Sequence, residues 1–340
     1  MGTLSYQDCL GILPRGERNQ ITDVPGVRVG HVTLSQGAVQ TGVTAVIPGS
    51  GSAFRSKFPA AVHVINGFGK SIGLMQIAEL GTLETPILLT NTFSVPACAE
   101  GLLSYMLFSH PEIGRSASTV NPVVMECNDG PLNDIRARNV RPEHALQALA
   151  DASEDFAEGA VGAGRGMTCY GWKGGIGSAS RRVTLGEKCY TVGALLLTNF
   201  GETGDLRLGN RRLEDASVQQ EDKGSCIILL ATDAPLSSRQ LARCTRRAQN
   251  GLARTGSCTG NGSGEVALMF STANRIPHYP DASPLLECTC IHEDLLNRAF
   301  RAVTECVEES VVSSLLHAET VTGRAGHVRH SLRDSGLVEL

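Results

Sequence analysis

Aromatic side chains are scarce in this 340-residue chain, where they make up 4% of the sequence and include a single tryptophan. Long apolar runs are missing as well, since no stretch reaches the ~18 consecutive apolar residues that a membrane-spanning helix needs. Residues Met1 to Arg18 contain no apolar segment of the length found in secretory signal peptides. We therefore expect a cytoplasmic protein that has no membrane partner.

Clustered positive charge is also lacking. The formal net charge is −4, and the basic pairs Arg181-Arg182, Arg211-Arg212 and Arg246-Arg247 stand apart from one another with few aromatic neighbours. Binding to a phosphate backbone needs a concentrated basic surface. The sequence therefore predicts no nucleic-acid partner, and the basic pairs are interpreted as solvated surface.

The spacing of cysteines and histidines does not fit a metal site. The 11 cysteines include no C-x-x-C pair, the two closest (Cys288 and Cys290) are too near each other for a zinc knuckle, and no H-x-x-x-H pair occurs. Reduced thiols in the cytoplasm explain the odd number of cysteines better than a disulfide framework. The glycines between Gly159 and Gly177 do not form a dinucleotide-binding fingerprint. We expect neither a metal nor another cofactor.

The chain is rich in glycine, with 38 residues. Hydrophobic residues make up 41% of the sequence and few of them are aromatic, so we expect a core of mainly aliphatic side chains. Strand-like and helix-like segments alternate along residues 1–340, which predicts a single domain of the α/β or α+β class. The predicted strands are Val27–Val32, Gly42–Ile47, Val62–Ile65, Ile87–Thr90, Tyr190–Asn199, Ser225–Thr232 and Val266–Phe270. The predicted helices are Leu74–Leu80, Ala99–His110, Pro142–Glu158, one from a Ser237 or Ser238 cap to about Asn250, and His292–His317.

One short motif is typical of a serine hydrolase. Gly69-Lys70-Ser71-Ile72-Gly73 matches the G-x-S-x-G elbow, and it stands between a predicted strand and a predicted helix. The pattern recurs by chance in glycine-rich chains, so a turn with an ordinary serine is the simpler interpretation. A hydrolase that uses Ser71 nevertheless remains an alternative.

A second serine occupies a different kind of position. The polar segment Glu202–Gly224 is predicted to be an exposed loop, and the fully apolar strand predicted from Ser225 follows it directly. A hydroxyl at such a boundary can attack the preceding carbonyl, and Gly224 would permit an unusual backbone there. The freed amine, with a reference pKa of roughly 7.7–8.0, could then help to accept the hydroxyl proton. Because Gly-Ser is a common dipeptide, an ordinary strand start is the better interpretation of these residues alone.

Several segments in the same order resemble one protein family over about residues 20 to 330. They are Ile21–Val27, Gly42–Val46, Leu132–Ile135, Gly171–Gly177, Gly224–Ile228, Ala231–Leu236 and Asn261–Glu265. The family is the DmpA-like L-aminopeptidase/D-esterase group, which includes the β-peptidyl aminopeptidases. The resemblance implies a four-layer αββα sandwich, similar to that of Ntn hydrolases but with different strand connectivity. It also implies self-cleavage into residues 1–224 and 225–340, which stay together as an αβ protomer of a homo-oligomer.

The resemblance also assigns roles to individual residues. Ser225 matches the nucleophile, and Ser263 and Glu265 match the partners that handle its proton. A carboxylate can orient a hydroxyl that in turn hydrogen-bonds the nucleophile. Asn199 matches an asparagine that helps to hold the oxyanion. Without the resemblance, these residues would be interpreted as a turn and strand ends.

One position departs from the family pattern. The family has a tyrosine before the Asp-Gly of the corresponding segment, where this chain has Asn128 in Glu126-Cys127-Asn128-Asp129-Gly130. Asn128 supplies no phenol, so transition-state stabilisation or substrate preference is expected to differ. Glu126 is a candidate partner for a substrate ammonium or, equally, a surface carboxylate.

Three functions follow from these observations. The leading one is a self-processing aminopeptidase, amidase or esterase that releases small N-terminal residues from peptides, amides or esters. The others are a hydrolase using Ser71 and a non-catalytic binding protein on the same fold. A self-cleaving acyltransferase of the ornithine acetyltransferase kind fits less well, because those enzymes have threonine at the cut.

Overall fold

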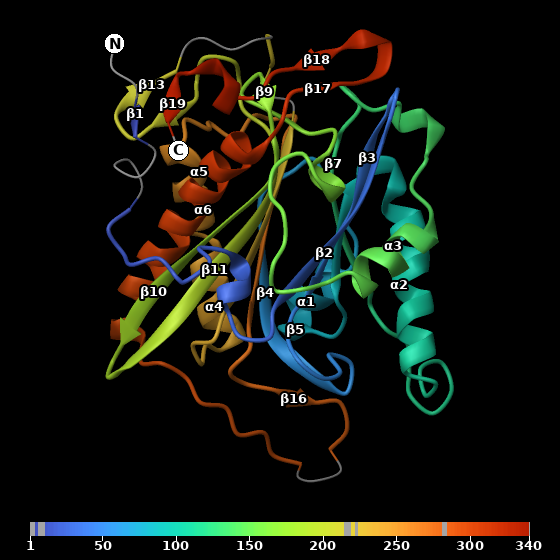
Figure 1. The fold of residues 1–340 in the computed structure, drawn as a ribbon. Coiled ribbons are helices and arrows are strands. Elements are labelled where there is room, and N and C mark those ends of the chain that lie inside the picture. The colour runs from blue at the N-terminus through green and yellow to red at the C-terminus, as the bar shows by residue number, and fades with distance from the viewer. Residues whose placement is uncertain (1–3, 6–10, 214–218, 222–223, 281–283, 340) are drawn as a thin grey trace.

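Two stacked β-sheets lie between two layers of helices in the computed structural model, which describes residues 4–5, 11–213, 219–221, 224–280 and 284–339 (Figure 1). The longer strands are β2 (Arg28–Gln36), β3 (Val39–Ile47), β4 (Ser56–Gly67), β6 (Ile87–Asn91), β7 (Val123–Cys127), β10 (Gly175–Leu185), β11 (Lys188–Asn199), β14 (Ser225–Thr232) and β15 (Gly264–Ser271). The two-residue strands are β1 (Leu4–Ser5), β5 (Thr82–Leu83), β8 (Thr168–Cys169), β9 (Trp172–Lys173), β12 (Arg207–Leu208), β13 (Arg211–Arg212), β16 (Ile276–Pro277), β17 (Val321–Thr322), β18 (Val328–Arg329) and β19 (Val338–Glu339). The α-helices are α1 (Leu74–Leu80), α2 (Val95–Ser109), α3 (Pro142–Ala150), α4 (Ser238–Thr245), α5 (Ala248–Arg254) and α6 (Asn297–His317).

The larger sheet has the strand order β10-β11-β14-β15-β4-β16, with β5 added on β4, and the smaller has the order β2-β3-β6-β7. Helices α4 to α6 cover the outer face of the larger sheet, and α2 and α3 cover the outer face of the smaller one (Figure 1). The neighbouring strands β14 and β15 are parallel, while β11 and β4 run antiparallel to them on either side. This is the four-layer αββα arrangement implied by the family resemblance, so the predicted fold class is confirmed.

The alternation of side chains on β14 links the layers. Every residue of this strand is buried. Cys226, Ile228 and Leu230 pack into the core beneath α4 to α6, whereas Ile227 and Leu229 pack between the two sheets. Successive side chains of a strand point to opposite faces, so an uninterrupted apolar run marks a strand that is covered on both faces. The predicted strand Ser225–Thr232 is confirmed for this reason.

Two predicted helices are wrong in their extent. The helix predicted over Pro142–Glu158 ends at Ala150, because the chain then turns and Ser153 exchanges backbone hydrogen bonds of 2.9 and 3.0 Å with Val29 of β2. The helix capped by Ser237 is interrupted after Thr245 and restarts as α5. The interruption lets Gly251 pack directly against α6, where an added Cβ would lie 2.6 Å from Val307.

The segment expected to be an exposed loop, Glu202–Gly224, is only partly a loop. Its described part holds the short hairpin of β12 and β13. Residues 214–218 and 222–223 lie outside the described residues. Among the residues that the structure covers, every helix is too short or too polar to cross a lipid bilayer.

Candidate active site

Ser225 is the first residue of β14 and lies at one end of the larger sheet. It pairs with Asn199, the last residue of β11, and with Gly264, the first residue of β15. The side of Gly264 away from Ser225 pairs with Gly67 at the end of β4. Four strand ends therefore meet around a serine that is 5% exposed. The sheet itself thus brings together two of the residues singled out from the sequence, Ser225 and Asn199.

Gly224 is required for space rather than for an unusual backbone. Its φ is not among the positive values of the described glycines. A Cβ on Gly224 would instead lie 1.7 Å from the carbonyl oxygen of Asn199. The close approach also lets the Gly224 carbonyl accept a hydrogen bond of 3.2 Å from the Gly264 N–H. The bond that precedes Ser225 therefore has its carbonyl held by a backbone donor.

Ser263 and Glu265 form a buried pair at the start of β15. The Ser263 hydroxyl donates to Glu265 Oε1 over 2.5 Å, and both residues are fully buried. The loop before them is held by the Asn66 side chain of β4, whose Nδ2 donates to the carbonyls of Gly260, Asn261 and Ser263. The pair predicted from the family resemblance is thus assembled, with Asn66 as a support that the sequence did not indicate.

The hydroxyl of Ser225 is not bonded to that pair. Among the described residues it makes no hydrogen bond, with Ser263 or with any other group. Glu265 is the register partner of Cys226, so its side chain leaves the sheet on the Cys226 side, opposite to that of Ser225. The carboxylate therefore leaves the sheet on the face opposite to the Ser225 hydroxyl.

The side-chain amide of Asn199 is held at both of its polar atoms. Oδ1 accepts a hydrogen bond of 2.9 Å from the Thr168 N–H, and Nδ2 donates one of 3.1 Å to the Asn128 carbonyl. A primary amide has two N–H donors, so one remains for another acceptor. Asn199 is 4% exposed and is the register partner of Ser225 in the neighbouring strand.

Asn128, which replaces the family tyrosine, contributes to the site through its backbone. Its side chain is exposed, and Oδ1 accepts a hydrogen bond of 2.9 Å from the N–H of Gly130 in its own turn. Its carbonyl accepts from Asn199. The side chain at this position is therefore turned away from the Asn199 amide.

Glu126 lies on β7 of the smaller sheet and is buried, which excludes the alternative of a surface carboxylate. Oε1 accepts a hydrogen bond of 2.8 Å from the Lys70 N–H, and Oε2 accepts one from the Thr92 hydroxyl. Lys70 belongs to the loop after β4. The same loop approaches Gly264 so closely that an added Cβ there would lie 2.7 Å from the Phe68 carbonyl oxygen and 3.2 Å from Ser225 Oγ. One loop therefore separates Ser225 from Glu126.

Ser71 lies in that loop too, between the end of β4 and the start of α1, as the elbow motif predicts. Its hydroxyl makes no hydrogen bond to any described residue, and so it contacts neither a histidine nor a carboxylate that could take its proton. The strand–turn–helix context of a nucleophile elbow is present, whereas its catalytic partners are not.

Burial changes the charge state of groups around the site. It raises the pKa of Asp129, which follows Asn128, to about 7, against hydrogen bonds from Thr41 and Asn133 that lower it. It raises the pKa of the Cys127 and Cys226 thiols well above their usual value, so both are neutral at pH 7. In the described part of the chain, no group of three or more His, Cys, Asp or Glu side chains lies close enough to hold a metal ion.

Residues that sequence reasoning missed are mostly backbone donors or buried supports. Thr168 and Gly264 act through their N–H groups, which leave no trace in side-chain type. Lys173 offered a signal, because a charged residue within a glycine-rich tract is unusual, and it is fully buried.

The comparisons with known proteins agree with this site. The model of Peptidase family S58 matches residues 19–329. The β-peptidyl aminopeptidase BapA of Sphingosinicella microcystinivorans is 36% identical over 95% of this chain and 87% of its own length.

Two solved structures are similar over almost the whole chain. A protein of Pyrococcus horikoshii has a TM-score of 0.94 and 47% identity, covering 98% of this chain and 97% of its own. The L-aminopeptidase D-Ala-esterase/amidase of Ochrobactrum anthropi, described as a prototype of the serine aminopeptidases and a variant of the Ntn hydrolase fold, has a TM-score of 0.91 and 32% identity, covering 97% and 95%. The chain therefore belongs to Peptidase family S58, in its DmpA-like group, and is an aminopeptidase.

Proposed function

We propose that the chain cuts itself between Gly224 and Ser225 and that the new N-terminal serine then hydrolyses small peptides, amides or esters with a free amine. One observation carries this proposal most directly. The unbonded hydroxyl of Ser225 follows a carbonyl, that of Gly224, which is held by the Gly264 N–H at 3.2 Å. A polarised carbonyl next to a nucleophile that lacks competing hydrogen bonds is the arrangement that acyl transfer needs.

The self-cleavage step involves only this chain and one water molecule. Ser225 Oγ adds to the Gly224 carbonyl carbon, the C–N bond breaks, and the hydroxyl proton passes to the departing nitrogen. The product is an ester between Gly224 and Ser225 Oγ. Water then hydrolyses the ester, which leaves a carboxylate on Gly224 and a free hydroxyl and amine on Ser225. The Gly264 N–H, aimed at the Gly224 oxygen, stabilises the negative charge that develops on it.

After cleavage, the buried Ser263–Glu265 pair would act on the new amine rather than directly on the hydroxyl. Glu265 leaves the sheet on the face opposite to the Ser225 side chain, and the Ser263 hydroxyl is already committed to Glu265. A buried carboxylate close to the amine controls whether that amine is protonated, and a neutral amine is the base for the Ser225 hydroxyl. The Gly264 N–H and the remaining N–H of Asn199 would receive the substrate oxyanion.

Glu126 would recognise the free amine of the substrate. An aminopeptidase must distinguish an ammonium group from an internal amide, and a carboxylate does so through a charge-assisted hydrogen bond. Glu126 is buried, is anchored by Lys70 and Thr92, and faces the loop that borders Ser225. The names of two relatives, a β-peptidyl aminopeptidase and an L-aminopeptidase D-Ala-esterase/amidase, support an N-terminal residue as the group released.

The test compares hydrolysis of an amino-acid amide with hydrolysis of its N-acetylated form. Glu126→Gln should lower kcat/KM for the free-amine substrate at least tenfold and leave the N-acetylated one within about twofold, because only the charge of the carboxylate is lost. An equal loss on both substrates would show that Glu126 supports the site without recognising the amine.

A homo-oligomer of αβ protomers in the cytoplasm completes the proposal. Exposed apolar side chains such as Phe108, which is 92% exposed, support association of protomers. The free exposed thiols of Cys189, Cys258, Cys288 and Cys290 suit a reducing compartment. Sedimentation velocity at micromolar concentration would reveal assemblies larger than one αβ protomer.

A further inference from the structure

Lys173 is a buried cation that the catalytic scheme above does not use. The residue is fully buried, and its ammonium group makes no ion pair with any described carboxylate. Nζ instead donates to three backbone carbonyls, those of Gly164, Met167 and Gly174, over 2.9, 2.7 and 2.6 Å. Burial holds the pKa of this ammonium well below its usual value, and the positive charge of Arg165 adds to the effect. Burying an ammonium group costs free energy, so the contacts that Lys173 makes need an explanation.

What Lys173 holds is the loop that fixes Asn199. The three carbonyls belong to one loop, residues 164–174, and Lys173 of β9 pairs with Thr168 of β8 inside it. The Thr168 N–H is the donor to Asn199 Oδ1. The other end of the loop lies flat on β11, since a Cβ on Gly174 would lie 2.6 Å from the Thr198 carbonyl oxygen. Lys173 is thus connected to the Asn199 amide through Thr168, which pairs with Lys173 and donates its N–H to Asn199 Oδ1.

The orientation of the Asn199 amide decides what it presents to the nucleophile. Its oxygen and nitrogen ends have nearly the same shape but opposite hydrogen-bonding character. With Oδ1 on the Thr168 N–H, the nitrogen end faces the Asn128 carbonyl and retains one free donor. Without that N–H the amide could rotate and bring Oδ1 towards the oxyanion, which would repel it.

We propose that Lys173 is a positioning residue for the oxyanion-binding amide of Asn199, because its ammonium gathers three carbonyls of the 164–174 loop and so holds the Thr168 N–H against Asn199 Oδ1. This inference rests on the proposed role of Asn199. An ammonium suits the task since it has three donors on a compact head and no acceptor. Methionine fills a similar volume without donors, and glutamine keeps only two.

A double-mutant cycle tests the proposal. The four proteins are the natural chain, Lys173→Met, Asn199→Ala and the double variant, with hydrolysis rates divided by the amount of chain that begins at Ser225. Lys173→Met should lower kcat about tenfold or more with KM within about twofold, and in the Asn199→Ala background it should lower kcat less than about twofold. Where too little processed chain forms, the same cycle is measured on the rate of self-cleavage. If Lys173→Met fails to fold, Lys173→Gln takes its place.

Lys57→Met is the matched control, since Lys57 pairs with Glu84 away from Asn199 and should affect stability without lowering kcat. An unchanged kcat in Lys173→Met, or the same loss in both Asn199 backgrounds, would overturn the positioning role and leave the proposed function standing. A normal kcat in Asn199→Ala would remove Asn199 as the oxyanion donor, and with it both that part of the proposed function and the role of Lys173.

Discussion

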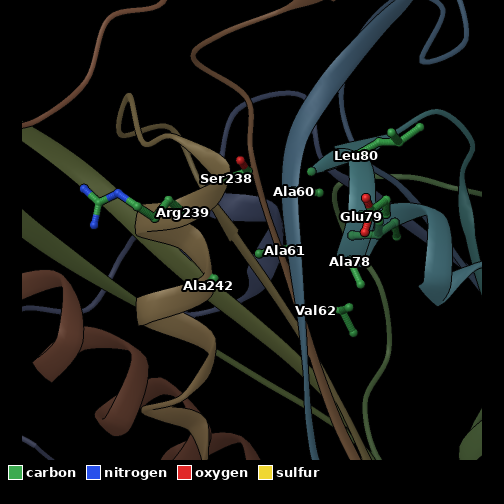
Figure 2. A pocket seen from close by; sticks show the side chains of 11 residues that line it. Ala60, Ala61, Val62, Ala78, Glu79, Leu80, Ser238, Arg239 and Ala242 are labelled. Atoms are coloured by element: carbon green, nitrogen blue, oxygen red, sulfur yellow. The ribbon is translucent and has the colours of Figure 1, made fainter.

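The Gly67 end of β4 and the middle of that strand differ in the groups that they present to a ligand. At the Gly67 end, strand ends, a loop and buried polar groups converge on Ser225. In the middle of the strand, Ala60, Ala61 and Val62 line a hollow of about 260 Å³ between α1 and α4 (Figure 2).

The charged side chains that line the hollow do not point toward one another. In Figure 2, the Arg239 side chain extends away from β4, where it forms an ion pair with Glu293, and the carboxylate of Glu79 lies on the opposite side of the strand. Around Ser225, by contrast, the Gly264 N–H is directed at the Gly224 carbonyl and the Asn199 amide is held by the Thr168 N–H. The directed donors, rather than the volume of a hollow, therefore support the assignment of the site to the Gly67 end.

The largest expected effect is the loss of the nucleophile at the Gly67 end. Ser225→Ala should abolish hydrolysis, because it removes the hydroxyl that begins β14 and follows the Gly224 carbonyl held by the Gly264 N–H. Ser71→Ala is the matched control from the neighbouring loop and should keep most of the activity. Steady-state assays on proteins of equal thermal stability make the comparison. Hydrolysis by Ser225→Ala, or its loss in Ser71→Ala, would favour the elbow serine.

The buried pair should give the next largest effect. Glu265→Gln keeps an acceptor for the Ser263 hydroxyl but removes the negative charge, so turnover should fall at least tenfold while the fold persists. Ser263→Ala should cause a loss of the same order. Turnover is measured together with circular dichroism of each variant. Normal turnover in Glu265→Gln would show that charge at this position is not needed to handle the proton.

Some strands and helices could be predicted from their local sequence pattern, and others could not. Strand β14 and helix α1 were predicted with the observed bounds, because a continuous apolar run and a short amphipathic segment can be recognised from neighbouring residues alone. Strand β7, which carries Glu126, was not predicted from periodicity, because its pairing with β6 is long-range. The strand β10 was likewise hidden at the end of a glycine-rich tract.

The candidate site likewise has a part that could be predicted and a part that could not. Ser225, Ser263, Glu265 and Asn199 were indicated by the family resemblance, and the structure brings them to one end of the larger sheet. The contacts that orient them could not be predicted, since they use backbone groups of Thr168, Gly264 and Asn128. Backbone donors are the same in every residue but proline, so only the fold can place them.

Asp129, which lies next to Asn128, should make the free energy of unfolding depend on pH. The folded-state pKa of Asp129, about 7, lies above the usual aspartate pKa of about 3.9, so between these values the folded protein binds more protons than the unfolded one. This contribution to stability is complete below about pH 4 and is lost as the pH rises through about 7, on the order of 1 kcal/mol per pH unit.

Urea unfolding at pH 5 and pH 8 measures this term. Asp129→Asn cannot ionise, so the natural chain should lose stability relative to this variant between the two pH values. Parallel changes in both proteins would mean that Asp129 is ionised at no extra cost.

The smallest effect is expected at the hollow. Arg239→Ala breaks an ion pair whose side chains are 66% and 37% exposed, so the free energy of unfolding should fall by no more than about 1 kcal/mol. Turnover should stay within about twofold of the natural value. Assays on the substrates used for Ser225→Ala measure this, and a large loss of turnover would place a functional site at the hollow as well.

The central claim is that one serine serves both self-cleavage and hydrolysis, and intact-mass analysis of the purified protein tests it most directly. We predict two masses, corresponding to residues 1–224 and 225–340, with the smaller fragment beginning Ser-Cys-Ile-Ile. Ser225→Ala should give one uncut, folded chain. Full hydrolytic activity in a chain that remains uncut, or a cut at any other bond, would contradict the account.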